Sequence, residues 1–99
     1  MTKIHVNYDN VFRQASVLQR LGEEHRRAAD ALDSQRAALS AAWQDPAGAA
    51  YCATATELVA AMRSSADELV SLGAQIRDAA LKYEAQEEAN AKAARGLAN

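Results

Sequence analysis

The chain has 99 residues, a formal net charge of −2 and 24% charged residues, with both signs interspersed. This length holds one domain, 1–99, at most. No basic run occurs, so we expect neither nucleic acid nor an anionic membrane surface as a partner. No apolar stretch is long enough to span a bilayer, and the N-terminal segment lacks the apolar core of a cleavable signal peptide. Export would therefore need a route that is independent of a signal peptide.

The first half of the chain predicts one long helix. Residues 1–6 favour a short extended arm, and Asn7 suits an N-cap, with Val6 and Val11 at the positions of a hydrophobic staple. From Val11 to Trp43 a stripe recurs in alternating steps of four and three, which is the spacing of a heptad repeat. Its members are Val11, Ala15, Leu18, Gly22, His25, Ala29, Leu32, Arg36, Leu39 and Trp43. This pattern predicts a helix over about 8–43, with a length of roughly 50 Å.

The segment Trp43-Gln44-Asp45-Pro46-Ala47-Gly48 marks a turn at about 43–46. Asp45 can cap the free amides of a new helix, and its charge suits the positive end of the helix dipole. Pro46 then falls at the first helical position, where its missing N–H costs nothing. A connection this short makes the two helices antiparallel neighbours.

The second half predicts a helix over about 46–90, followed by a frayed tail. Its tail, from Glu84 to Asn99, is polar and alanine-rich, and nothing in it demands burial. The apolar stripe of this helix is Tyr51, Ala55, Leu58, Met62, Ser65, Leu69, Leu72, Ile76, Ala79 and Tyr83.

The predicted fold class is all-α: an antiparallel two-helix hairpin that dimerises into a four-helix bundle. Folding the chain at the turn pairs positions whose numbers add up to about 90. Two helices alone bury only a strip of each, so we expect a second copy or a related hairpin to cover the remaining apolar surface. The residues expected at this helix-packing or dimer seam are Val11, Leu18, Leu32, Leu39, Leu58, Met62, Leu69, Leu72 and Ile76.

The sequence offers no good candidate for a metal, cofactor or catalytic site. His5 lies in the arm, His25 in mid-helix and Cys52 near the turn, and none has the spacing of a metal motif. The hairpin separates Cys52 from His25 by roughly 30 Å. A two-helix protein also provides no pocket for acid–base chemistry. We therefore expect no enzyme, and a free cysteine that fills space near the turn.

The chain resembles the WXG100 (ESAT-6-like) superfamily of small type VII secretion substrates. The resemblance rests on the length, the helical hairpin, Trp43 at the turn, and Tyr83-x-x-x-Glu87, which is similar to the Tyr-x-x-x-Asp/Glu export signal. The chain departs from the family's Trp-x-Gly, because Asp45 stands where glycine is expected and glycine follows only at Gly48. The departure indicates a divergent branch, such as a small partner of a larger secreted effector.

The resemblance implies a non-enzymatic protein that is exported folded, as a homodimer or as a heterodimer with a related helical hairpin. It implies that Trp43 is the turn residue and that Tyr83 and Glu87 form a secretion signal recognised by a secretion ATPase. The protein would be cytoplasmic before export, and secreted or associated with the cell envelope afterwards. The alternative is a cytoplasmic helical adaptor or chaperone that binds the helical region of a larger protein.

Overall fold

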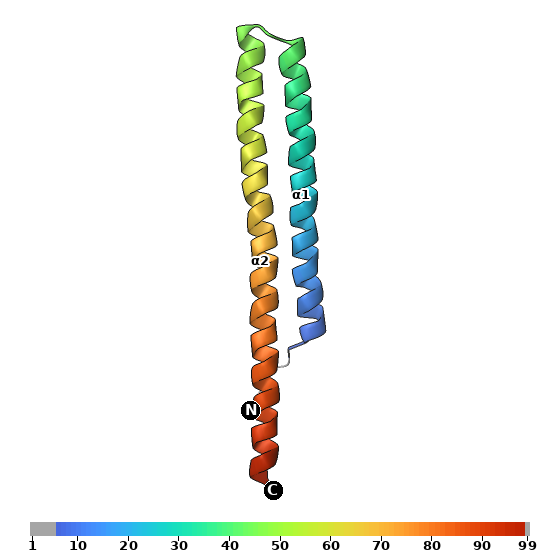
Figure 1. Cartoon of the computed structure of the whole chain (residues 1–99), viewed down its shortest axis with the longest axis vertical. Helices are drawn as coiled ribbons and strands as arrows, with labels where there is room; N and C mark the ends of the chain where they lie inside the picture. Colours follow the sequence, from blue (N-terminus) through green and yellow to red (C-terminus); the bar gives the residue numbers. More distant parts are fainter. Residues whose placement is uncertain (1–5, 99) are drawn as a thin grey trace.

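The computed structural model describes residues 6–98 of the chain, and the side chains of 6–96. Two helices make up the fold: α1 spans Tyr8–Ala42 and α2 spans Pro46–Ala98. They lie antiparallel and side by side, joined by a short turn at one end (Figure 1). The hairpin measures 82 × 19 × 17 Å, so it is a rod. The described part of the chain thus has the predicted all-α hairpin fold. Of the arm predicted over residues 1–6, residues 1–5, with His5, lie outside the described part.

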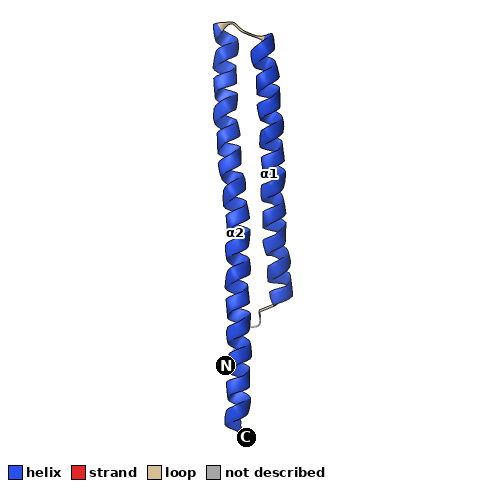
Figure 2. Ribbon diagram, viewed as in Figure 1, coloured by secondary structure: helices blue, strands red, loops and turns tan. Residues whose placement is uncertain are grey.

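The two helices differ in length, so the second extends alone beyond the start of the first (Figure 2). The sequence predicts fraying from about residue 90, whereas α2 remains helical to Ala98. Alanine, glutamate, glutamine and lysine, which dominate the tail, are strong helix formers. A hydrogen bond from Gln86 Nε2 to Asn90 Oδ1, 3.0 Å long, also bridges one turn there. Local propensity therefore sustains this segment without a packing partner.

Local signals set the ends of the helices. The Asn7 side chain accepts a hydrogen bond of 3.0 Å from the backbone N–H of Asn10, which makes Asn7 the N-cap of α1. At the other end Trp43 leaves the helical region at φ −135° and ψ 90°, while its N–H still donates to the Leu39 carbonyl at 2.8 Å. Pro46 is the first residue of α2.

Small residues line the contact between the two helices. They recur at every seventh position on each helix, so they form a straight line along its surface. We call this line the seam. It consists of Ala15, Gly22 and Ala29 on α1, and of Cys52, Val59, Ala66, Gly73 and Ala80 on α2.

The seam brings the two backbones close together. A Cβ atom added at Gly22 would lie 2.6 Å from Val70 Cγ2 and 2.8 Å from the carbonyl oxygen of Ala66. A Cβ atom at Gly73 would lie 2.7 Å from the carbonyl oxygen of Ala15. These partners match the predicted pairing of positions that add up to about 90. Glycine is therefore required at both points by the approach of the opposite helix.

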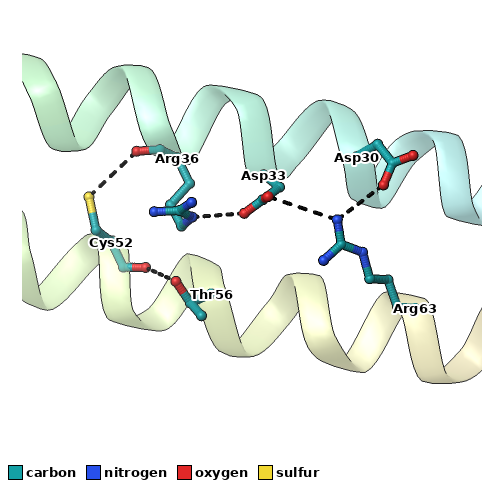
Figure 3. A network of polar contacts seen from close by, with 6 residues as sticks. All are labelled: Asp30, Asp33, Arg36, Cys52, Thr56 and Arg63. Carbon is teal, nitrogen blue, oxygen red and sulfur yellow. Dashed lines mark hydrogen bonds and ion pairs between the residues drawn. The ribbon is translucent and has the colours of Figure 1, made fainter.

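One flank of the seam carries ion pairs. Residues one and four positions after a seam residue lie to the same side of the line, and they form the interhelical ion pairs. Arg26 Nη2 contacts Asp67 Oδ1 at 2.6 Å, and Arg63 Nη2 contacts Asp30 Oδ1 at 3.1 Å. Figure 3 shows Arg63 reaching from α2 toward α1, where Asp33 also lies within 3.8 Å. We call this side of the hairpin the polar face.

The other flank is apolar. Residues three positions after a seam residue fall on the opposite side of the line from those at four. Because the ion pairs join first- and fourth-position residues of the two helices on one side, both third-position flanks share the other side. We call this side the apolar face. Residues that directly precede a seam residue lie on the same side as the third-position residues. The apolar face carries Val11, Leu18, Leu32 and Leu39 of α1, and Tyr51, Leu58, Met62, Leu69, Leu72, Ile76 and Tyr83 of α2.

Candidate functional site

Two groups of residues at opposite ends of the rod are candidates for recognition. The first is the turn, where the rings of Trp43 and Tyr51 stack with their centroids 5.5 Å apart and their planes 27° from parallel. Trp43 is 38% exposed and Tyr51 is 62% exposed, so the pair forms an aromatic surface at the tip of the hairpin. Stacked aromatic rings that stay partly exposed are typical of contact surfaces.

The side chain of Asp45 stabilises this turn by hydrogen bonding. Its Oδ1 accepts a hydrogen bond of 2.8 Å from the backbone N–H of Gly48, so it caps α2. That bond, followed by a hydrogen bond from the Trp43 side chain, lowers the pKa of the Asp45 carboxyl below its ordinary value. The same carboxylate thus joins the tryptophan to the start of the second helix.

Gly48 leaves room for the indole. A Cβ atom at this position would lie 2.6 Å from Trp43 Cγ, so any larger residue would displace the ring. Within the described residues no backbone φ is positive, which means that this turn does not use a left-handed residue. Asp45 can therefore stand where the Trp-x-Gly pattern has glycine, because its cap and the space at Gly48 define the turn instead.

The second group lies at the open end of the hairpin, where α1 begins. Tyr83 is 68% exposed on α2, and Glu87 follows one turn later with its side chain exposed. Tyr8, the first residue of α1, lies beside them and is half-buried. A surface groove in this region is lined by residues at the start of α1, including Asn7 and Tyr8, and by Glu84.

Tyr8 is the site residue that the sequence analysis does not find. Partial burial, and then the Glu87 carboxylate within reach of a hydrogen bond, raise the pKa of its phenol above the ordinary value. A signal for it exists in the sequence, because Tyr8 stands seven residues before Ala15 and so continues the line of the seam. Recognising that signal requires knowing that the seam is made of small residues.

None of the large apolar residues predicted at the helix-packing or dimer seam is buried in the single hairpin, where the residues of the seam lie between the helices. Their part in helix packing or in a dimer stays a prediction. Leu39, Leu58 and Leu72 are exposed. The half-buried members are Val11, Leu18, Leu32, Met62, Leu69 and Ile76.

The described residues show no arrangement suited to metal binding. Across 6–98, no group of three or more His, Cys, Asp or Glu side chains could hold an ion. His25 is half-buried on α1, while Cys52 is buried, with its Sγ 3.9 Å from the carbonyl oxygen of Arg36. No described helix is long and apolar enough to cross a membrane.

The fold and these two groups define a small elongated helical hairpin with an aromatic turn. A family model described as "WXG100: Proteins of 100 residues with WXG" matches residues 3–88 of the chain. The chain therefore belongs to the WXG100 family, as the sequence resemblance predicts. Searches of curated proteins and of solved structures gave no match.

Proposed function

We propose that this protein is a non-enzymatic substrate, or a co-secreted partner of a larger effector, of a type VII secretion system. Family membership supports a small helical protein of the secretion-substrate kind. The observation that carries the proposal is the exposure of Tyr83, at 68%, one helical turn before Glu87. An exposed aromatic ring beside a carboxylate on a continuous helix suits capture by a receptor groove, here that of a secretion ATPase.

The apolar face supports a dimer with a second helical hairpin, which would complete a four-helix bundle. Tyr51, Leu58 and Leu72 are exposed there, and the neighbouring leucine, isoleucine and methionine side chains are only half-buried. The ion pairs lie on the polar face, so the apolar face can be covered without breaking them. The second hairpin is a copy of this chain or a related protein.

An antiparallel dimer would also bring the two candidate groups together. Within one chain, Trp43 and Tyr83 lie at opposite ends of the hairpin, about 55 Å apart along α2. Pairing two hairpins head to tail places the turn of one beside the open end of the other. A receptor could then contact Trp43 of one protomer and the Tyr83–Glu87 segment of its partner at a single place.

Secretion is tested by separating cells of the native host from the culture medium and blotting both fractions. A cytoplasmic marker protein controls for lysis. We expect the wild type in the medium or the cell envelope, and Tyr83→Ala retained in the cytoplasm. Leu81→Ala is the matched control, because Leu81 is also exposed on α2, at 46%, but lies away from the apolar face.

Retention of both the wild type and Leu81→Ala inside the cell would contradict the proposal. In that case the intracellular adaptor that binds a larger helical protein becomes the better account. Export of Tyr83→Ala at the wild-type level would leave secretion intact but remove Tyr83 from the signal.

A further inference from the structure

A pair of polar residues interrupts the apolar face halfway along the rod. His25 lies three residues after the seam residue Gly22. Ser65 directly precedes the seam residue Ala66, so both polar residues are on the apolar face. The close approach of Gly22 to Ala66 places them at the same level of the two helices. His25 is half-buried and Ser65 is exposed. We call this pair the polar waist.

The polar waist lies at the centre of the part of the rod where both helices are present. The first helix spans Tyr8–Ala42, so His25 has seventeen residues before it and seventeen after it. Between residues 11 and 83, no Asp, Glu, Lys or Arg stands three positions after a seam residue or directly before one. The waist is therefore the polar centre of a face that carries no acidic or strongly basic side chain over this range.

The side chains on the apolar face of α1 have nearly the same order in both directions from His25. Leucines lie seven residues away on either side, at Leu18 and Leu32. Branched aliphatic residues lie fourteen residues away, at Val11 and Leu39. Contact with an identical antiparallel helix requires this order, because each residue before His25 then meets the residue equally far after His25 in the other copy. A different partner hairpin would place no such requirement on the sequence.

The apolar face of α2 is arranged about Ser65 in a comparable way. Leu58 and Leu72 lie seven residues before and after it, and both are exposed, at 52% and 46%. Fourteen residues away, Tyr51 stands on one side and Ala79 on the other. In an antiparallel pair of copies, the large ring of Tyr51 would face the small side chain of Ala79, and this pairing of large with small would occur twice.

We propose that the apolar face binds a second copy of this chain, head to tail and in full overlap, with the polar waist on the two-fold axis. This inference rests on the proposed function, from which it takes the dimer, and it identifies the partner and the register. His25 of one copy then faces His25 of the other. Two neutral imidazole rings can hydrogen-bond to one another, because each has one donor and one acceptor.

The polar waist also excludes other registers. A shift of one heptad places each imidazole against a leucine of the other copy, where it has no hydrogen-bond partner. One buried polar group left unpaired lowers an association constant by about tenfold, so two histidines disfavour the shifted dimer by about a hundredfold. Single polar residues in the apolar stripe of a coiled coil specify its register in the same way.

Disulfide trapping tests the orientation and the register of the dimer. Single cysteines are introduced into the full chain with Cys52→Ala, which removes the native thiol from a line where alanine also occurs. We expect His25→Cys to form a linked dimer under mild oxidation, because this position meets itself across the two-fold axis. Leu18→Cys alone should be linked about a tenth as much or less, whereas a mixture of Leu18→Cys and Leu32→Cys should be linked readily.

A second set of variants tests the role of the imidazole. His25→Leu should strengthen association about tenfold, measured by sedimentation equilibrium, because a polar group no longer has to be buried. It should also permit shifted dimers, so that Leu18→Cys becomes linked to itself in that background. His25→Asn is the matched control, because it keeps a polar side chain and should keep the register fixed. Circular dichroism should show the same helix content in all variants.

Three results would overturn the inference. Linkage of Leu18→Cys to itself with His25 intact would mean another register. Linkage of His25→Cys to Ser65→Cys, but not to itself, would mean that the two hairpins lie parallel. A purified wild-type chain that remains monomeric would mean that the partner is a different hairpin. Retention of the wild-type protein in the cell overturns the proposed secretion instead, while trapping still identifies the partner and the register.

Discussion

At the scale of single residues, Asp45 stabilises the turn at the position where the Trp-x-Gly pattern has glycine. Its carboxylate caps Gly48 and receives a hydrogen bond from the Trp43 side chain. The cap requires a side-chain acceptor, while the charge adds a favourable interaction with the helix dipole. These two contributions can be separated by substitution, because asparagine keeps the acceptor and loses the charge.

The pKa of Asp45 is lowered in the folded protein, so its ionised form stabilises the fold above the unfolded-state value of 3.8. This contribution is lost as the pH falls through 3.8 toward the lower pKa of the folded state. We expect Asp45→Asn to remain folded and to lose less stability than the wild type between pH 5 and pH 2, an acid range of about this width being usual for a lowered carboxyl pKa.

Thermal denaturation followed by circular dichroism across that range measures the difference in Tm between the two proteins. Asp45→Ala provides the comparison, because it removes the acceptor as well and should lower Tm at neutral pH too. An equal acid dependence in the wild type and Asp45→Asn would mean that the charge of Asp45 does not contribute to the fold.

The turn could be derived from the sequence because its determinants are adjacent in the chain. Aspartate before proline ends one helix and begins another whatever the rest of the protein does. The position of Tyr8 beside the Tyr83–Glu87 segment could not be derived in this way. Tyr8 lies far from that segment along the chain, so its position depends on which line of each helix surface faces the other helix.

At the scale of the helices, the structure separates two stripes that have the same seven-residue period. The seam contains Val59 and Ala66, whereas the stripe of large residues contains Leu58, one residue before Val59, and Met62, three residues after it. At about 100° per residue, both steps turn to the same side of the seam, so the two stripes face different directions. Periodicity therefore predicted the helices and their register.

Periodicity alone did not determine which stripe lies inside the hairpin. A search for apolar residues finds the bulkier stripe, since alanine and glycine contribute little to a hydrophobic pattern. Small residues at the contact allow the backbones to approach closely, and that closeness is visible only when both helices are present. The length of α2 has a simpler explanation, because alanine and glutamate in its tail are strong helix formers.

The close approach predicts that Gly22→Ala destabilises the hairpin, although alanine is the better helix former. The added Cβ would lie 2.8 Å from the backbone oxygen of Ala66, so the helices must separate. Overpacking of this kind costs about 1–3 kcal/mol, and the gain in helix propensity returns about 1 kcal/mol. We expect a net loss of about 1 kcal/mol in the free energy of unfolding.

Urea denaturation monitored by circular dichroism measures this loss. Gly96→Ala is the matched control, because nothing lies within 4 Å of a Cβ atom at that position. It should leave stability unchanged or raise it slightly. A Gly22→Ala variant as stable as Gly96→Ala would show that the two helices can separate at no cost.

At the scale of the whole molecule, the polar face and the apolar face of the rod differ in how their side chains are contacted within one hairpin. The polar face carries its own ion pairs, which are exposed and contribute little to stability individually. The apolar face leaves large side chains in contact with solvent. Exposed leucines occur on the apolar face and away from it, so the same substitution can be compared at both places.

We expect Leu58→Asp, on the apolar face, to prevent dimerisation while leaving each hairpin helical. Leu58 is 52% exposed in the single chain, so an aspartate there remains solvated until a partner covers it. Leu81→Asp is the control, because Leu81 is exposed to a similar extent, at 46%, but lies away from the apolar face.

Sedimentation equilibrium of the two variants, or of each mixed with a candidate partner hairpin, measures the association directly. Dimers should persist in Leu81→Asp and be lost in Leu58→Asp. Equal association of the two variants would place the contact on another surface of the hairpin.

The elongation of the hairpin has a practical consequence for such measurements. A globular protein of this size has a radius of gyration of about 13 Å, whereas the Cα radius of gyration of this hairpin is 22.9 Å. A rod experiences more hydrodynamic drag than a sphere of equal mass, so a single hairpin leaves a gel-filtration column early. Its elution volume would match that of a globular protein considerably heavier than 10.6 kDa. A monomer calibrated against globular standards would thus be mistaken for the dimer.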